Sequence, residues 1–545
     1  MDRTTTTRAA IRPPAATTAG PSARRGAGPA PPPHPPRVPG APPATPAALR
    51  ERAVRVLRAN WTGASTVPSR ALYPHQWSWD SAFIAIGSRH LSPLRAQLEL
   101  ETLLAAQWAD GRVPHIVFNP AVPLDAYFPS PDFWRSTTAG RAAGAPQAVQ
   151  TSGIVQPPVH ALAAWLVHLA DPGLSRARSF LPRLHPRLAA WHRHLLRHRD
   201  LGGAGLAAVV HPWEQGMDNS PCWDGPLSRV PPARPHSYRR ADLDHGSPQD
   251  RPTDLDYGRY VRLAAEYRDG GYGTGGYGTG GFGFAVEDPA FNALLIASEH
   301  ALARITRELG APATARHDRA ERLTRVLVER LWDGEGGIFR CRDLLAGGPE
   351  RGGAGSAGGG GALVDERGVT GLIPLVVPGL PRGVVDDLVR TARGPHFELG
   401  GRVRLVPSHD LLSPAFDPRR YWRGPAWFNT NWLLERGLRL HGAREHADAL
   451  RAALLDTAVA SDFAEYVDPY TGDGCGARGF SWSAALALDL GVAAEGDLDV
   501  GRDMGRDVSA GGSAGGSAGV TKSWSKTVSR DTTAGPGSDE GARND

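Results

Sequence analysis

The sequence predicts an all-α protein folded as an (α/α)6 barrel, in which six helical hairpins form a double ring. Apolar residues recur at helical spacing through most of the middle of the 545-residue chain. The pattern marks twelve segments, which is enough for six hairpins. If their directions alternate around a ring, the long connections emerge at one end, and these connections carry nearly all the Trp, Tyr, Asp and Asn clusters. That end is therefore expected to be the mouth of the barrel.

Each expected helix rests on its own apolar pattern. Residues 94–104, whose leucines fall mostly at helical offsets, are typical, and residues 323–331 repeat the pattern. Pro157 and Pro158 suit the first turn of a helix, where the missing N–H does no harm. In chain order, the expected helices are 47–60, 79–90, 93–109, 156–170, 183–198, 254–268, 288–308, 315–331, 383–394, 425–441, 443–459 and 480–490.

Composition limits the part of the chain that can fold. Residues 1–46 are mostly Pro, Ala, Thr and Arg, and residues 496–545 are mostly Gly, Ser, Asp and Thr. Neither segment has the apolar content for a core, so both are expected to be disordered tails around one domain at 47–495. Two Gly-rich insertions, near 269–284 and 345–362, follow the sixth and eighth expected helices. The alternation of helix direction places them on the face opposite to the mouth.

Charge and cysteine content exclude several classes of protein. The net charge is +5 and the pI is near 9.3, but the arginines are spread among nearly as many acids, which argues against nucleic-acid binding. No apolar run is long enough to span a membrane, and no secretory leader is visible, so a cytoplasmic protein is expected. Three distant cysteines show no metal-binding spacing. Homo-oligomer formation stays open.

Two carboxyl groups in unlike surroundings are the candidate catalytic pair. Asp218 lies among Trp213, Met217 and Trp223, an apolar setting that raises a carboxyl pKa. Glu465 precedes a polar, turn-rich segment where a carboxylate stays ionised. A protonated acid and an ionised base are what hydrolysis of a glycosidic bond requires. The alternative for Asp218 is a loop residue that caps a helix or closes a turn.

Polar and aromatic residues in the same long loops are the candidate substrate-binding set. Aromatic faces stack on sugar rings, while carboxylates and amides bind hydroxyl groups. Asp80 could instead only favour the start of its helix, Trp427 could be a core residue, and His115 is interpreted as structural. Arg251 could hold an anionic group, or be a solvated surface arginine. The set comprises Tyr73, Trp77, Trp79, Asp80, Asn119, Tyr127, Gln156, Trp213, Arg251, Tyr421, Trp422 and Trp427.

At these residues the sequence resembles glycoside hydrolases of the processing α-glucosidase I and mannosylglycerate hydrolase type. The segments that carry the resemblance are 76–80 (QWSWD), 213–221 (WEQGMDNSP), 421–427 (YWRGPAW), Glu465-Tyr466 and 479–485 (GFSWSAA). The resemblance implies an (α/α)6 barrel over about residues 50–490, an inverting mechanism, Asp218 as general acid and Glu465 as general base. It also implies sugar contacts for Tyr73, Trp77, Asp80, Tyr421, Trp422 and Trp427, and a carboxylate contact for Arg251. The chain departs from the family in its Gln215, where Ser is common, in its insertions and in its tails.

The combined interpretation is an inverting α-glycoside hydrolase that releases a hexose from a small glycoside, with glucosylglycerate or mannosylglycerate as the expected substrate. No metal or organic cofactor is implied, and the expected partner is a small carbohydrate. One alternative is an α-glucosidase for neutral oligosaccharides, which would need no arginine clamp. The other is a barrel that binds carbohydrate without catalysis.

Overall fold

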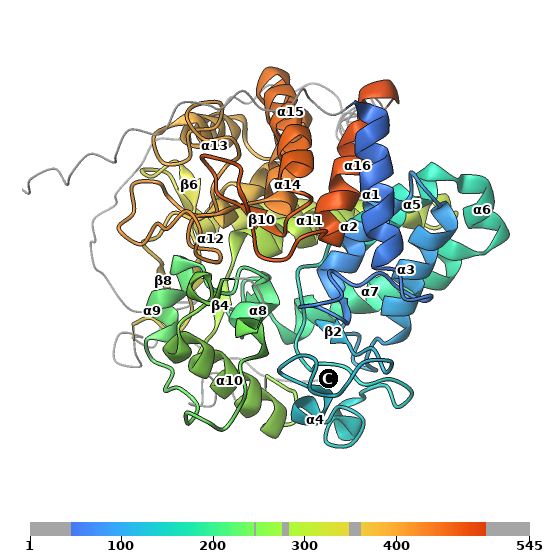
Figure 1. Cartoon of the computed structure of the whole chain (residues 1–545), viewed down its shortest axis with the longest axis vertical. Coiled ribbons are helices and arrows are strands. Elements are labelled where there is room, and N and C mark those ends of the chain that lie inside the picture. Colours follow the sequence, from blue (N-terminus) through green and yellow to red (C-terminus); the bar gives the residue numbers. More distant parts are fainter. Residues whose placement is uncertain (1–44, 245–246, 275–282, 348–360, 497–545) are drawn as a thin grey trace, which may run out of the picture. The chain divides into compact units, whose positions relative to one another are not determined.

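A double ring of helices forms the body of the protein (Figure 1). We describe it from a computed structural model, over residues 45–244, 247–274, 283–347 and 361–496. In these residues, six elements pack in sequence into a closed inner ring: α2 (Ser78–Ser88), α5 (His160–Ala170), α11 (Pro289–Glu308), the 3-10 helix η7 (Ile373–Val376), α14 (Phe428–Leu440) and α16 (Ser481–Gly496). An outer set surrounds them: α1 (Pro46–Ala59), α3 (Pro93–Ala105), α7 (Phe180–His198), α12 (Thr314–Leu331), α13 (Arg382–Arg393) and α15 (Arg444–Ala460). This confirms the predicted (α/α)6 barrel.

The two rings differ in how their side chains are buried. Nearly every residue of α2 and α11 is buried, as expected for helices surrounded by protein. Outer helices bury one stripe, which in α12 contains Leu323, Leu327 and Leu331. Side-chain caps fix several helix starts: the Thr45 hydroxyl accepts from the N–H of Ala48 before α1, and other caps act at α3 and α11.

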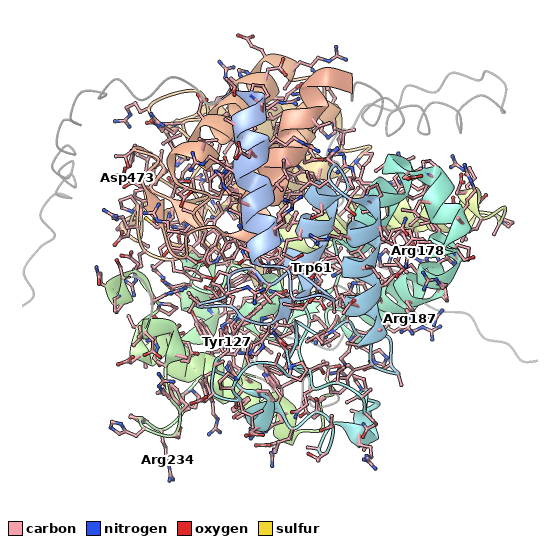
Figure 2. All side chains as sticks on the ribbon, turned by 45° about the vertical axis from the view of Figure 1, so that its right-hand side comes forward. Trp61, Tyr127, Arg178, Arg187, Arg234 and Asp473 are labelled. Atoms are coloured by element: carbon pink, nitrogen blue, oxygen red, sulfur yellow. The ribbon has the colours of Figure 1, made fainter. Side chains whose placement is uncertain are left out.

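Arginines on the outside connect neighbouring outer helices. Figure 2 shows Arg178 and Arg187 on the side of the molecule formed by α3 and α7. Arg187 donates to the carbonyl of Leu104 at the end of α3 (2.7 Å), and Arg178 donates to Gln97 (3.0 Å) and Glu101 (3.0 Å) on the same helix. These contacts fix the spacing of α3 and α7.

Two-residue antiparallel strands join the long loops at one end of the barrel. β1, β4 and β9 each run directly into the N-terminus of an inner helix, so the strands set where those helices begin. The pairings are β1 (Gln76–Trp77) with β2 (Ile116–Val117); β3 (Ala208–Val209), β4 (Val286–Glu287), β7 (Arg342–Asp343) and β8 (Ala362–Leu363) in that order; β5 (Trp332–Asp333) with β6 (Ile338–Phe339); and β11 (Gly474–Cys475), β10 (Tyr466–Val467) and β9 (Ala426–Trp427) in that order.

The connections between the ring helices contain further helical segments, most of them short. They are α4 (Pro131–Trp134), η1 (Arg141–Ala143), α6 (Pro172–Ala177), α8 (Pro212–Gln215), η2 (Pro221–Trp223), α9 (Asp224–Leu227), η3 (Ala241–Leu243), η4 (Pro248–Asp250), α10 (Asp254–Asp269) and η6 (Val369–Gly371). None of the described helices is long and apolar enough to cross a membrane.

One predicted ring helix lies outside the ring. The segment expected at 254–268 forms α10, but α10 lies below α8 and α9, apart from the inner and outer helices (Figure 1). The third inner place is taken by α11, which was expected to begin the fourth hairpin, and the fourth inner place by the 3-10 turns of η6 and η7 at 369–376, which the apolar pattern did not reveal. The architecture was predicted correctly, whereas the assignment of its third and fourth hairpins was wrong.

This change also corrects the placement of the Gly-rich insertions. The ends of the 345–362 insertion lie at β7 and β8, in the same sheet as β3 and β4 of the mouth loops, and not on the opposite face. The 269–284 insertion follows α10, so the alternation argument no longer places it. Residues 275–282 and 348–360, and the predicted tails except Thr45, Pro46 and Gly496, lie outside the described residues.

Candidate active site

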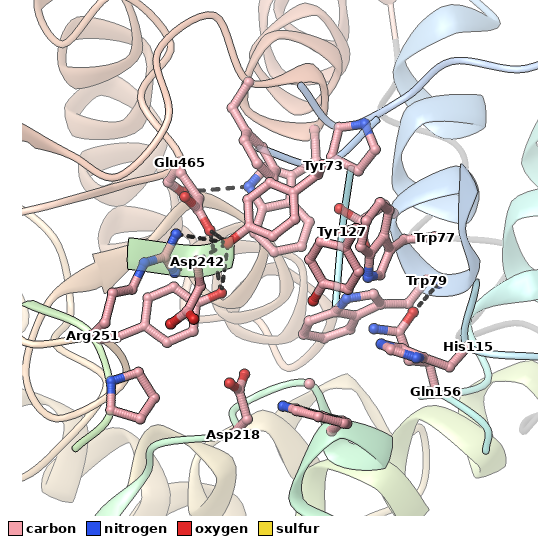
Figure 3. Close-up of a pocket in the computed structure, with 18 of the residues that line it drawn as sticks. Tyr73, Trp77, Trp79, His115, Tyr127, Gln156, Asp218, Asp242, Arg251 and Glu465 are labelled. Atoms are coloured by element: carbon pink, nitrogen blue, oxygen red, sulfur yellow. Dashed lines mark hydrogen bonds between the residues drawn. The ribbon is translucent and has the colours of Figure 1, made fainter. Parts of the chain in front are cut away.

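A single pocket brings most of the predicted residues together at the N-terminal ends of inner helices (Figure 3). Asp80 lies in the first turn of α2, and Trp482 lies in the first turn of α16. Helix N-termini carry partial positive charge, which favours acidic groups and sugar hydroxyls there. The lining residues are Pro68, Tyr73, Trp77, Trp79, Asp80, His115, Tyr127, Gln156, Trp213, Gly216, Asp218, Asp242, Arg251, Pro252, Tyr257, Tyr421, Glu465, Phe480 and Trp482.

Asp218 presents a carboxyl group that no other described side chain holds. It follows α8 and the turn at Gly216, whose φ of +81° and contact with Trp79 leave no room for a side chain: an added Cβ would lie 2.5 Å from that ring. Burial raises the pKa of Asp218 from 3.8 to about 7, the charges of Glu465 and Asp242 add to this, and Arg251 opposes it. A carboxyl with this pKa keeps its proton near neutrality and can donate it.

Glu465 is held in the opposite way, as an acceptor. Its Oε1 accepts from the hydroxyls of Tyr73 (2.9 Å) and Tyr421 (3.2 Å), and its Oε2 accepts from the N–H of Ala477 (3.0 Å). Burial raises the pKa of both tyrosines well above the usual value, so they keep the protons that they donate. Three donors stabilise the ionised form of a carboxylate that is only 1% exposed. Figure 3 shows Glu465 and Asp218 on opposite sides of the pocket.

Arg251 supplies positive charge beside Glu465. Both of its terminal nitrogens donate to the Tyr73 hydroxyl at 3.1 Å, and its guanidinium carbon lies 4.6 Å from the centre of the Tyr421 ring. The side chain is buried, with 6% of its surface exposed. Tyr73 therefore accepts from Arg251 and donates to Glu465, which connects the cation to the carboxylate. Of the two interpretations left open for Arg251, the structure excludes the solvated surface residue.

Aromatic rings and a second acid form the other side of the pocket. Trp77 meets Tyr127 edge-on at 5.0 Å, and Trp79 meets Trp482 edge-on at 5.5 Å. The amide oxygen of Gln156 accepts from the N–H of Trp79 (3.1 Å). Burial, with the nearby charge of Glu465, raises the pKa of Asp80 well above its usual value. This side offers stacking surfaces next to a carboxyl group that no other described side chain holds.

Three of the predicted binding residues do not line the pocket. Asn119 serves its own loop: its side chain donates to the carbonyl of Pro74 (3.3 Å) and accepts from the N–H of Ala121 (3.0 Å). Trp422 and Trp427 stack on each other, 3.8 Å apart and parallel within 1°, and are almost fully buried. Trp427 also meets Tyr421 edge-on at 5.0 Å. The two tryptophans therefore support Tyr421 from behind, and core packing explains Trp427.

The pocket also contains residues that were not among the predicted site residues. The most consequential is Asp242 of η3, whose carboxylate forms an ion pair with Arg240 (2.6 Å). An acid in a loop that also contains Asp244 and Asp250 among Arg, Ser and Pro gave no signal in the sequence. His115, interpreted as structural, lines the pocket, and burial lowers its pKa to about 3, so it is neutral there. The others are Pro68, Gly216, Pro252, Tyr257, Phe480 and Trp482.

Comparison with known proteins identifies the family to which the chain belongs. A family model described as the mannosylglycerate hydrolase MGH1-like glycoside hydrolase domain matches residues 73–483. The chain belongs to this family. The double ring of this glycoside hydrolase extends beyond the match at both ends, because α1 precedes it and α16 continues past it.

Curated relatives of this glycoside hydrolase cover most of the chain. It is 41% identical to a mannosylglycerate hydrolase of Rubrobacter radiotolerans over 445 residues, which is 81% of this chain and 96% of the relative. It is also 39% identical to a glucosylglycerate hydrolase of Mycolicibacterium hassiacum over 452 residues, 81% of this chain and 97% of the relative.

Solved structures agree with both the family and the fold. The crystal structure of a mannosylglycerate hydrolase from Thermus thermophilus, in complex with Tris and D-glycerate, aligns with a TM-score of 0.72 at 40% identity. The alignment covers 81% of this chain and 99% of that one. A neutral trehalase of Saccharomyces cerevisiae shares the fold alone, with a TM-score of 0.51 at 15% identity.

Proposed function

We propose that this enzyme hydrolyses the α-glycosidic bond of a hexosyl glycerate with inversion at the anomeric carbon. One observation carries the proposal: Asp218 and Glu465 lie on opposite sides of one pocket, where burial raises the pKa of Asp218 to about 7 and three hydrogen-bond donors hold the carboxylate of Glu465. The names of relatives about 40% identical over most of the chain support a glycosyl glycerate as the substrate class.

In the proposed reaction, the proton of Asp218 passes to the glycosidic oxygen while the bond from that oxygen to C1 breaks. Glu465 takes a proton from a water molecule while the oxygen of that water bonds to C1 from the opposite face. Inversion of this kind needs about 6.5–9.5 Å between the two carboxyl groups, which leaves room for the water. The next turnover begins when Asp218 has regained a proton from solvent and Glu465 has lost one.

The sugar is proposed to lie among the aromatic rings, with its hydroxyls at Asp80. The pocket-lining faces of Trp77, Trp79 and Trp213 suit the C–H faces of a hexose. The carboxyl of Asp80 has no side-chain donor among the described residues and is available to sugar hydroxyls. Tyr127 and Gln156 line the same pocket and would complete the set of polar contacts.

The carboxylate of glycerate is proposed to bind Arg251. Negative charge at Glu465 and Asp242 would repel an anion unless a cation were present, and Arg251 is the described cation that lines the pocket. Its guanidinium has five N–H groups, and Tyr73 occupies only part of them. The competing function, hydrolysis of neutral α-glucosides, needs no such clamp.

The experiment compares two substrate classes in two proteins. Wild type and Arg251→Ala are assayed with glucosylglycerate, mannosylglycerate and neutral α-linked disaccharides. We expect wild type to prefer a glycosyl glycerate, and we expect Arg251→Ala to raise KM for it by about 30-fold or more, from the loss of about 2–5 kcal/mol. Equal losses on both classes, or better turnover of a neutral disaccharide by wild type, would favour the oligosaccharide function.

We further propose a cytoplasmic enzyme, supported by three buried and unpaired cysteines.

A further inference from the structure

Three side chains hold the backbone around Asp218, although no other described side chain holds its carboxyl group. The amide oxygen of Gln215 accepts from the N–H of Met217 (2.9 Å), and the indole N–H of Trp223 donates to the carbonyl of Met217 (2.7 Å). The hydroxyl of Tyr260 donates to the carbonyl of Asp218 itself (2.6 Å). Because no described side chain holds the carboxyl, its position depends on this backbone and on the rotamer of Asp218.

The two ends of this arrangement are anchored in different parts of the fold. Gln215 donates to Asp288 (3.2 Å), the buried cap of α11, which also accepts from Thr370 (2.6 Å) and Cys341 (3.3 Å). Tyr260 is 1% exposed and comes from α10, the helix outside the ring. The loop at 215–223, called the acid loop below, is therefore fixed to the barrel on one side and to α10 on the other.

We infer that Tyr260 is a positioning residue for the general acid: its hydroxyl fixes the peptide carbonyl of Asp218 and so aims the carboxyl group at the glycosidic oxygen. Tyr260 does not line the pocket, so it acts through Asp218 and not on the substrate. The inference rests on the proposed role of Asp218. Proton transfer demands accurate placement, and a displacement of about 1 Å can lower the rate about a hundredfold.

The test is Tyr260→Phe, assayed with two substrates that differ in their need for an acid. The glycerate of a glycosyl glycerate leaves as an alkoxide unless the glycosidic oxygen is protonated, whereas the fluoride of an α-glycosyl fluoride leaves without a proton. We expect kcat for the glycosyl glycerate to fall about tenfold to a hundredfold with little change in KM, while hydrolysis of the fluoride stays within about twofold. The phenyl ring that remains keeps its contact with Trp213, 5.8 Å away.

Tyr272→Phe is the matched control. Tyr272 is also fully buried and also donates to a main-chain carbonyl, that of Trp134, but it is remote from the acid loop and does not line the pocket. It loses the same kind of hydrogen bond, so a general effect of that loss on folding would appear in both variants. We expect Tyr272→Phe to have the same ratio of glycosyl glycerate hydrolysis to glycosyl fluoride hydrolysis as wild type.

Asp218→Asn separates failure of this inference from failure of the proposed function. It should lose the glycosyl glycerate activity and keep most of the fluoride activity. If it does and Tyr260→Phe lowers both activities alike or neither, the positioning role is wrong and the acid role stands. If Asp218→Asn lowers both activities alike, the acid role of Asp218 and the positioning role of Tyr260 are both wrong. Should Tyr260→Phe fold poorly, Gln215→Met decides, because it releases the other side of the same backbone and should lower the same ratio.

Discussion

Replacing Asp218, the proposed general acid, with Asn should stabilise the protein, and the gain should depend on pH. Burial raises the pKa of Asp218 from 3.8 to about 7. A folded pKa above the unfolded one means that the folded state binds more protons between these values, so this residue makes the wild type lose stability as pH rises through that window. A difference of about three in pKa corresponds to about 4 kcal/mol. Because the carboxyl opens on the pocket, solvent screening reduces this to about 2 kcal/mol.

Asp218→Asn removes the titration, so its gain over wild type should be about 2 kcal/mol at pH 8 and less than half of that at pH 4. Guanidinium denaturation at both pH values measures it. Asp318→Asn, on the exposed face of α12, is the control and should change stability by less than about 0.5 kcal/mol at either pH. An equal gain at both pH values, or a loss of stability at pH 8, would refute the argument that desolvation sets the state of Asp218.

Three further predictions follow from the same contacts. Asp242→Asn removes a negative charge that raises the pKa of Asp218, so the basic limb of the pH profile of kcat/KM should move to lower pH; no movement would contradict this. Tyr421→Phe removes one of the two hydroxyl donors to Glu465 and should lower kcat about tenfold, while retention of full activity would show that this donor is dispensable. A chain shortened to residues 45–496 should keep its activity and its thermal unfolding temperature, and a large loss of either would show that a terminal segment docks on the domain.

Much of the fold was predictable because most helices are long and carry a periodic apolar pattern. The inner element at 369–376 was missed because it is only two short 3-10 segments, all buried, with Gly371 and Pro374 inside the run. Those residues suggest a loop, and complete burial removes the contrast between faces. The opposite error arose at α10, which has a polar and an apolar face like a ring helix but buries that face against the mouth loops. A periodic apolar pattern indicates that one face of a helix is buried, but it does not indicate which part of the protein covers that face.

The residues of the site could be predicted from the sequence to a similar extent. Asp218 and Glu465 stood out because their neighbours differ in polarity, and the structure places both in one pocket. Trp422 and Trp427 lie in as aromatic a cluster as the true lining residues, but the sequence does not show which side of Tyr421 faces the pocket. Asp242 could not be recognised because its importance comes from proximity to residues far away in the chain.

Time-resolved proton NMR of the purified wild-type enzyme with glucosylglycerate and mannosylglycerate tests the central claim most directly. It follows release of glycerate and the anomer of the hexose that forms first. We expect that at least one substrate is cleaved and that the β-anomer appears first, with the α-anomer forming only at the rate of mutarotation. Initial release of the α-anomer would contradict the paired roles of Asp218 and Glu465, and absence of glycerate release from both substrates would contradict the proposed function.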